Sequence, residues 1–150
     1  MCTHDEENYK IVRYEGQTIK QEIEKDDQGN PLYEAGEKML FVTENNNGDI
    51  CASDVNGKIV VVVNKAGKLR YRYKGQQTMR VQFEPSTIVT DSAGCIIIED
   101  VGNFCTHIID QDGQFLRSLD FCGLMSVDTL GRLWMGEYEN GIVKIIKYSK

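Results

Sequence analysis

The sequence predicts an all-β protein built from repeated units of four short antiparallel strands. Three observations lead to this fold class: short apolar runs rich in β-branched residues, turn residues between these runs, and glycines that recur with similar surroundings. The chain has 150 residues, of which 41% are hydrophobic, a proportion that is ordinary for a soluble domain. We therefore expect one compact domain with a core of its own.

The repeat is anchored on Gly48, Gly94 and Gly131. Each of these glycines follows a turn, precedes an apolar-rich strand and has an acidic residue six positions later. The acids are Asp54, Asp100 and Glu137. A mean spacing of about forty residues suits a unit of four short strands and is too long for solenoid repeats of about twenty residues.

The units follow one another along the chain. Residues 8–36 supply two strands and form a half unit, and residues 39–75 and 83–122 form two complete units. Residues 124–148 form a unit that stops after its third strand. Four antiparallel strands in about forty residues are typical of one blade of a β-propeller, so these units are interpreted as blades.

Local sequence justifies the strands and turns. In residues 57–75, the run IVVVV is followed by a turn that contains glycine and then by alternating apolar and basic residues, which is typical of a hairpin. Because IVVVV is apolar on both faces, we expect neighbouring blades to cover both. Asn45, Asp91 and Asp128 each lie three residues before a repeat glycine and are expected to form Asx turns.

The number of blades predicts a partial propeller. About three and a half blades make a closed ring cramped, so we expect an open ring, or arc. The end blades of an arc each lack a neighbour, which leaves apolar faces uncovered around residues 10–14, 133–138 and 143–148. We therefore expect the chain to self-associate or to need missing blades.

Charge and patterning exclude several classes of function. Seventeen basic and 23 acidic residues give a formal net charge of −6, which does not favour binding to nucleic acid. The first residues, MCTHDEENYK, lack the apolar stretch of a signal peptide, and no apolar run reaches the length of about eighteen residues that a membrane span needs. We therefore expect a cytoplasmic protein with no membrane partner.

The sequence predicts no metal site and no cofactor. The five cysteines are scattered, odd in number and contain no C-x-x-C pair, so we expect reduced thiols. Cys105 and His107 lie two residues apart on a predicted strand and share a face, but two ligands are too few for a metal site. Glu24, Asp26 and Asp27 lack the spacing of a calcium loop and are expected in a solvated turn.

The segment GCIIIEDVGNFCTHIIDQDG resembles an NHL repeat, the β-propeller unit of the tripartite-motif (TRIM-NHL-like) proteins. The pattern of that family is a glycine, an apolar strand, an acid, an asparagine three residues later, and a strand that ends in an acid before a glycine turn. The matching residues here are Gly94, Asp100, Asn103, Asp110 and Gly113. The resemblance covers roughly residues 8–150, and the chain is similar to a C-terminal portion of such a propeller.

This resemblance implies a non-catalytic interaction module, a protein-binding scaffold that recognises a substrate or partner for a tripartite-motif-like protein. One family feature differs, because the arginine that often follows the acid by five residues is replaced here by Ile59, Cys105 and Ile142. RNA binding, known in the wider family, is the alternative function. A fragment of a propeller lyase or hydrolase is disfavoured, because those enzymes collect several metal ligands at a central channel.

Catalytic motifs are not found in the sequence. No serine sits in a G-x-S-x-G pattern, and His4 and His107 have no evident acid or nucleophile partner nearby in the sequence. We therefore expect that the protein is not an enzyme.

We expect a protein partner to bind at the flat end of the propeller where the loops after each second strand gather. The candidate residues on this rim are Asp54, Asn56, Lys58, Asp100, Asn103, Glu137 and Asn140. A structural role is the stronger interpretation for the three acids of this set, each accepting hydrogen bonds from a neighbouring turn.

The alternative RNA contact consists of Arg70, Arg72, Lys74 and Arg80, with tyrosines interleaved. If Leu69, Tyr71 and Tyr73 face inward, however, the arginines only solvate the outer face of an edge strand, and this interpretation is favoured. Trp134 alternates with Leu133 and Met135 on a predicted strand and is expected in the core between blades rather than on a ligand-binding surface.

Overall fold

The structure is a computed structural model and describes residues 9–148. The described residues form thirteen β-strands: β1 (Ile11–Glu15), β2 (Thr18–Ile23), β3 (Leu40–Glu44), β4 (Ile50–Asp54), β5 (Ile59–Val63), β6 (Leu69–Tyr73), β7 (Pro85–Thr90), β8 (Ile96–Asp100), β9 (Cys105–Ile109), β10 (Phe115–Leu119), β11 (Leu124–Val127), β12 (Leu133–Gly136) and β13 (Val143–Ile146). This part of the chain contains no helix long and apolar enough to cross a membrane. The predicted all-β class is confirmed.

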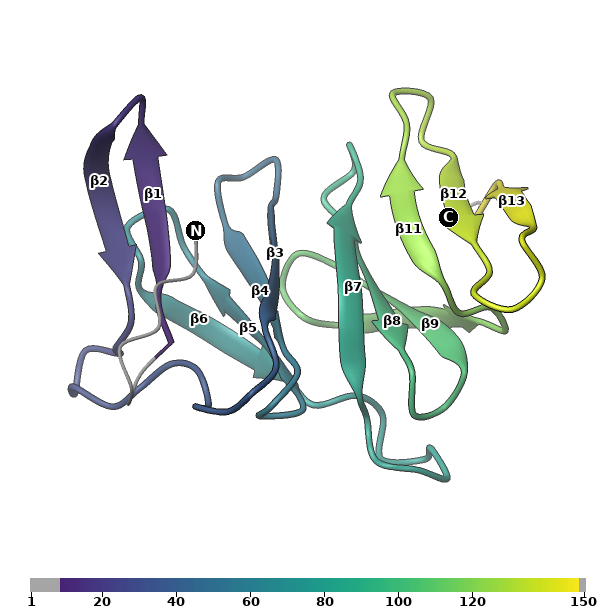
Figure 1. Cartoon of the computed structure of the whole chain (residues 1–150), viewed down its shortest axis with the longest axis horizontal. Helices are drawn as coiled ribbons and strands as arrows, with labels where there is room; N and C mark the ends of the chain where they lie inside the picture. The colour runs from purple at the N-terminus through teal and green to yellow at the C-terminus, as the bar shows by residue number, and fades with distance from the viewer. Residues whose placement is uncertain (1–8, 149–150) are drawn as a thin grey trace.

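The strands form four antiparallel sheets in chain order. The first sheet is β1-β2, the second is β3-β4-β5-β6, the third is β7-β8-β9-β10 and the last is β11-β12-β13. Figure 1 shows them following one another from the purple N-terminal pair to the yellow C-terminal sheet. The first strands of the later sheets lie side by side, since β7 contacts both β3 and β11. This arrangement is an arc of propeller blades.

The two faces of the IVVVV strand, β5, pack into two different hydrophobic clusters. Val61 and Val63 pack with Ile23 between the first and second sheets, whereas Val60 and Val62 pack toward the third sheet. All four valines are fully buried. Since successive side chains of a strand point to opposite faces, a central strand between two neighbouring sheets must be apolar throughout. The expectation that both faces are covered is confirmed.

The second strand of the third sheet repeats this arrangement. Ile96 and Ile98 pack against the second sheet, and Ile97 packs with Leu133 and Met135 of the last sheet. All five side chains are fully buried. Each such side chain removed from water contributes about 1.5–3 kcal/mol. The two middle sheets are therefore held from both sides.

One turn recurs between the strands. The Oδ1 atom of an Asp or Asn accepts hydrogen bonds of 2.9–3.0 Å from the backbone N–H groups two and four residues later. A glycine three residues after this side chain has a φ of 72–88°. The turn occurs at Asp26, Asn64, Asp91, Asp110 and Asp128.

Asn45 departs from this pattern. Its Oδ1 accepts instead from the N–H of Asn46, and its Nδ2 donates to the carbonyl of Gly94 at 2.9 Å. The predicted Asx turn is therefore confirmed at Asp91 and Asp128 and is wrong at Asn45, whose amide is used to join the second sheet to the third.

The outer face of the last sheet is uncovered. Leu133 and Met135 on β12 are fully buried, whereas Trp134 between them is 36% exposed. The expectation that Trp134 lies in a core between blades is wrong, because alternation points it to the face that no further sheet of residues 9–148 covers. Val143 and Ile145 on the paired strand β13 are also exposed. The expected uncovered face is thus confirmed here, and self-association stays a prediction.

The opposite end of the arc is better protected. Ile11 and Val12 on β1 are half-buried, and Ile23 on β2 is buried. Exposure around residues 10–14 is largest at Tyr14. Ile19, paired with Tyr14, is also exposed, so this end has an uncovered apolar face with fewer exposed side chains than the last sheet has.

Candidate functional site

The repeat acids end the second strand of each complete blade and organise the loop that follows. Asp54 is buried and accepts hydrogen bonds from the N–H of Glu34 at 2.7 Å and from the N–H of Gly57 at 2.9 Å. Asp100 is also buried and accepts from the N–H of Glu84 at 3.0 Å. The two acids therefore attach the segment that enters each blade to the loop of the same blade, and neither carboxylate faces solvent.

The asparagines of these loops fasten the same entering segments. Asn56 accepts from the N–H of Lys38 at 3.2 Å and donates to the carbonyl of Lys38 at 2.8 Å. Asn103 makes the matching pair with Val81, at 3.2 and 3.0 Å. Two hydrogen bonds to one residue of the entering segment fix the loop firmly, so these side chains are occupied within the chain.

The position four residues after each acid has a left-handed backbone. Lys58 has a φ of 54°, Phe104 a φ of 53° and Gly141 a φ of 63°. Residues other than glycine adopt this backbone conformation at a cost of about 1–2 kcal/mol. Lys58 uses its side chain to pair with Glu84, with Nζ 3.2 Å from Oε1. Phe104, in contrast, is 77% exposed.

Glu137, the third repeat acid, lies in a more open loop. It forms an ion pair with Lys144 and accepts a hydrogen bond from Nδ2 of Asn140 at 3.1 Å. The hydrogen bond from Lys144 and that from Asn140 lower the pKa of Glu137, so it is a carboxylate at neutral pH. Among the seven predicted rim residues, Glu137 and Asn140 line a cavity that Phe104 also lines.

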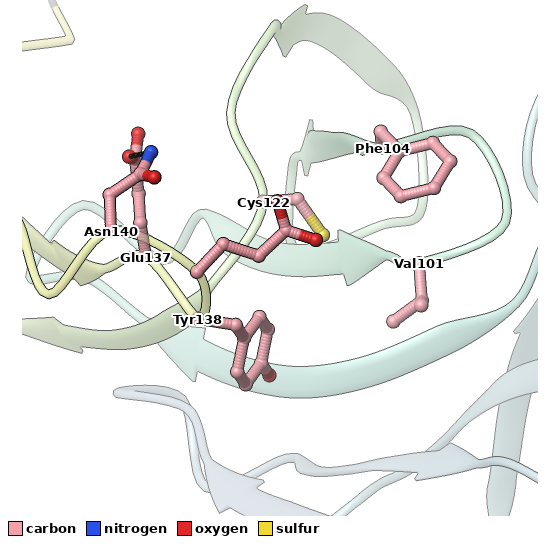
Figure 2. Close-up of a pocket in the computed structure, with 7 residues that line it drawn as sticks. Val101, Phe104, Cys122, Glu137, Tyr138 and Asn140 are labelled. Carbon is pink, nitrogen blue, oxygen red and sulfur yellow. Dashed lines mark hydrogen bonds between the residues drawn. The ribbon is translucent and has the colours of Figure 1, made fainter.

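This cavity of about 280 Å³ lies between the third and last sheets. It is lined by Val101, Phe104, Cys122, Glu137, Tyr138, Glu139 and Asn140. Figure 2 shows Val101 and Phe104 on one side, Tyr138, Glu137 and Asn140 on the other, and Cys122 between the two groups. The aromatic and aliphatic side chains supply apolar contact, and Glu139 adds a carboxylate beside Glu137, which is paired with Lys144.

A buried acid connects two of the residues that line the cavity. Glu99 is fully buried, and its Oε1 accepts from the Cys122 thiol at 3.1 Å. Its Oε2 accepts from the Thr87 hydroxyl at 2.9 Å and from the Tyr138 hydroxyl at 3.4 Å. Glu99 therefore holds Cys122 and Tyr138 in place from beneath the cavity.

The thiol and the phenol that line the cavity both donate to Glu99 and are not free nucleophiles. Burial, followed by the hydrogen bond to Glu99, raises the pKa of the Cys122 thiol to about 12. Burial also raises the pKa of Tyr138. At neutral pH the thiol is protonated, and a protonated thiol is a poor nucleophile. The arrangement suits binding of an apolar group that carries a positive charge.

The predicted RNA-contact residues do not form one free basic surface. Arg70 is ion-paired with Asp49 and with Asp112, the latter at 2.6 Å. Arg72 and Lys74 line a separate cavity of about 410 Å³ together with Asp54. Arg80 lies on the segment between the second and third sheets. The inward orientation of Leu69, Tyr71 and Tyr73, with exposed Arg70 and Arg72 alternating, is confirmed.

Cys105 and His107 share a face of β9, as the sequence predicts, and the structure adds a third potential ligand. Asp100, on the adjacent strand β8, is paired in register with Cys105. One ligand atom from each of the three side chains lies within 4.8 Å of the others, and all three residues are buried. The sequence-based interpretation missed Asp100 because the two strands are joined by a loop, and only their register brings the acid opposite the cysteine.

Several residues of the cavity were also missed. Phe104 lies four positions after the acid, where the third unit has Gly141, and this alignment was the available signal. Glu99 lies within an apolar strand, and nothing near it in the sequence indicates that Thr87, Cys122 and Tyr138 surround it.

Comparison with models of known protein families gives no match, and comparison with curated proteins gives none either. Among solved structures, a catalytically inactive histidine-to-alanine variant of virginiamycin B lyase from Staphylococcus aureus with quinupristin matches with a TM-score of 0.61 and 16% identity, over 94% of this chain and 48% of that chain. The selenomethionine form of the same lyase matches with a TM-score of 0.60 and 17% identity, over 95% and 49%. A Bacteroides fragilis protein named as exported matches with a TM-score of 0.57 and 16% identity, over 95% and 42%.

At these identities the similarity shows the fold, a β-propeller arrangement of antiparallel blades. The chain spans about half the length of the lyase structures that it matches. The expectation that the chain is not an enzyme is corrected by this comparison, because blades of the same arrangement belong to a lyase. The absence of catalytic sequence motifs is not a sufficient basis for that expectation, since a propeller site is assembled from loops far apart in the sequence.

Proposed function

We propose that the chain is an NHL-type propeller module that binds a polypeptide partner in the cavity between its third and last sheets. The observation that carries the proposal is Phe104, an aromatic side chain 77% exposed on a left-handed backbone at this cavity. Holding a bulky residue in that conformation costs about 1–2 kcal/mol, and neither burial nor an ion pair offsets the cost. Contact with a partner would offset it.

The chemistry of the cavity indicates which side chain of the partner it accepts. Val101, Phe104 and Tyr138 offer an apolar surface, and Glu139 brings a carboxylate to the same opening, whereas Glu137 is paired with Lys144. A lysine or arginine fits both features, because its methylene stem packs on apolar side chains and its charged group meets a carboxylate or an aromatic face. The net charge of −6 also favours a basic partner.

The size of the cavity supports recognition of a single side chain. Sites for small molecules usually have volumes of about 300–1,000 Å³, and this cavity has about 280 Å³. One basic side chain of an extended segment would therefore fill it. The rest of the segment would lie over Phe104 and the loop of residues 137–141.

The proposal is tested with immobilised short peptides that carry a central arginine or lysine between small residues, with acidic peptides as the comparison set. We expect the full chain to bind the basic peptides, and Phe104→Ala or Tyr138→Ala to weaken binding by about 10- to 30-fold, as for central residues of an interface. Leu130→Ala is the matched control, since Leu130 is 75% exposed in the turn between β11 and β12 and lies outside the cavity.

Two outcomes would contradict the proposal. Binding of acidic peptides as strongly as basic ones would show that the carboxylates do not select the ligand. Equal binding by Phe104→Ala and the Leu130→Ala control would show that the exposed aromatic is not at the interface.

A further inference from the structure

A cluster separate from the cavity lies inside the third sheet, where Asp100 ends β8 and Cys105 begins β9. The carboxylate of Asp100, the thiol of Cys105 and the imidazole of His107 converge within 4.8 Å of one another. All three side chains are buried, and the relative exposure of Asp100 and His107 is 0%. Carboxylate, thiolate and imidazole are all ligands of zinc-class metal ions.

His107 is oriented as a metal-binding histidine is. Its Nδ1 lies 2.8 Å from the hydroxyl of Tyr73, which also accepts a hydrogen bond from Gln76 at 3.3 Å. Its Nε2 lies 3.2 Å from Oδ2 of Asp100 but makes no hydrogen bond of acceptable geometry, so it is a buried nitrogen without a hydrogen-bond partner among the described residues. A histidine that binds a metal uses one nitrogen for the ion and gives the other to an outer hydrogen-bond partner.

Asp100 is fixed in the same manner. Its Oδ1 accepts from the backbone N–H of Glu84 at 3.0 Å and from that of Asn103 at 3.3 Å. Its Oδ2, the atom that faces His107, accepts from Nδ2 of Asn103 at 2.8 Å. The carboxylate is therefore held from outside while one oxygen points at the imidazole, which is the arrangement that outer hydrogen bonds give to a ligating acid.

We propose that Asp100, Cys105 and His107 form a binding site for a zinc-class divalent cation. In a tetrahedral site with the ion about 2.1 Å from nitrogen and oxygen, those two atoms are about 3.4 Å apart, close to the 3.2 Å that separates Nε2 of His107 from Oδ2 of Asp100. Water completes the fourth position, as it does in zinc sites with three protein ligands.

Charge and protons balance in this site. The Cys105 sulfur carries a proton as a free thiol, and only the thiolate is a metal ligand. On binding, the sulfur–hydrogen bond is replaced by a sulfur–metal bond and the proton passes to solvent. One thiolate, one carboxylate and a neutral imidazole then neutralise the dication, which removes the cost of burying a net charge.

The second sheet shows that the fold does not need these ligands. Asp54 occupies the position of Asp100 and is paired in register with Ile59, where the third sheet has Cys105. Val61 takes the place of His107, opposite Ala52 rather than Ile98. The acid is thus part of the shared loop, whereas the sulfur and the imidazole are added beside it in the third sheet.

The test is titration of the full, reduced and chelator-treated chain with Co²⁺, which reports a thiolate ligand by charge-transfer absorption in the near ultraviolet. We expect one Co²⁺ per chain, with the absorption abolished by Zn²⁺. Cys105→Ser should weaken the affinity at least 100-fold and remove the band. Tyr73→Phe should retain the band and weaken the affinity by about 10- to 100-fold, the usual effect of removing an outer hydrogen bond.

Two controls locate the ion. Cys51→Ser alters a buried cysteine of the second sheet, and Cys2→Ser alters a cysteine near His4 in the sequence, so both variants should bind as the unaltered chain does. X-ray absorption of the zinc-loaded unaltered chain needs no variant and should show one sulfur with nitrogen and oxygen neighbours. A band that survives Cys105→Ser, a band lost in Cys2→Ser, a zinc spectrum without sulfur, or no binding of either ion would each overturn the proposal.

Discussion

The loop of the second sheet at residues 54–58 and the loop of the third sheet at residues 100–104 share a framework and differ in what lies beside it. Both begin with a buried acid that accepts backbone hydrogen bonds from the entering segment, and both contain an asparagine that clamps one residue of that segment. Both end on a left-handed residue. The differing residues are Ile59 and Val61 in the second sheet against Cys105 and His107 in the third.

This difference teaches where a propeller blade can vary. The hydrogen bonds of the acid and the asparagine hold the loop, so their loss would disturb the blade itself. Positions on the adjacent strand face the acid without being needed by it, and they accept either apolar or ligating side chains. Ligating side chains can therefore be placed beside a structural acid without a change of fold.

The largest expected effect concerns the shared framework. Asp54→Ala and Asp100→Ala should each lower the free energy of unfolding of the metal-free chain by about 2–3 kcal/mol, because each removes a buried carboxylate that accepts two backbone hydrogen bonds. Urea unfolding of both variants measures the two values. Asp100 also accepts from Nδ2 of Asn103, so its variant should lose somewhat more, and a loss for Asp54→Ala more than about 1.5 kcal/mol above that for Asp100→Ala would contradict the shared role of the two acids.

A smaller effect is expected when the third sheet is given the residues of the second. Cys105→Ile with His107→Val removes buried polar groups and supplies side chains that the same position accommodates elsewhere. We expect the metal-free chain to stay folded and to lose about 1–2 kcal/mol, because isoleucine is larger than cysteine and the Tyr73 hydroxyl loses its bond to His107.

The same double variant also separates structure from ligand binding. Its melting temperature should not rise on addition of Zn²⁺, whereas that of the unaltered chain should rise. Collapse of the fold in the double variant would show that Cys105 and His107 belong to the framework and that the comparison with Ile59 and Val61 fails.

The last residues of the two loops, Lys58 and Phe104, both have a left-handed backbone, and their glycine variants can be compared. Phe104→Gly relieves backbone strain of about 1–2 kcal/mol and adds an unfolded-state entropy cost of about 0.5–1 kcal/mol, so thermal unfolding should show a net gain of about 0.5–1 kcal/mol. Peptide binding should nevertheless fall, because the aromatic contact is lost. Lys58→Gly is the control: it relieves similar strain, and its exposed pair with Glu84 contributes little.

Peptide binding should therefore differ between Phe104→Gly and Lys58→Gly, whereas their thermal stabilities should change alike. If Phe104→Gly retains full peptide binding, the aromatic side chain has no contact role. If both variants lose stability, the left-handed conformation is supported by contacts that the strain argument leaves out.

The sequence allowed prediction of those features that local pattern determines. Apolar runs such as Val60–Val63 identify strands covered on two faces, and the Asx residues with their glycines identify the turns. Trp134 could not be placed in this way, because its burial depends on whether another blade follows. Asp100 could not be joined to Cys105 and His107 either, because that contact depends on strand register and loop length rather than on spacing along one strand.

The smallest expected effect lies at the position of Asn45, Asp91 and Asp128, where blades differ in charge. Asp128 accepts from Nε1 of Trp134 at 2.8 Å and from Nε of Arg132 at 2.7 Å, besides its two backbone bonds. The bond from Trp134, with those from Arg132 and Leu130, holds the pKa of Asp128 well below its usual value of 3.8. A carboxyl whose pKa is lowered in the folded state stabilises that state above its unfolded pKa, and the contribution is lost as pH falls through the folded pKa.

Asp128→Asn, which copies Asn45, should therefore lower the melting temperature slightly at pH 7, and the difference from the unaltered chain should shrink as the pH is lowered below about 4. Thermal unfolding across a range of about pH 2–7 measures it, with Asp110→Asn as the control, since Asp110 forms the same turn with backbone donors. A deficit that stays constant down to the lowest pH would mean that the substituted amide fails to reproduce the geometry of the turn, and that the charge held by Trp134 and Arg132 contributes nothing to the stability of the last sheet.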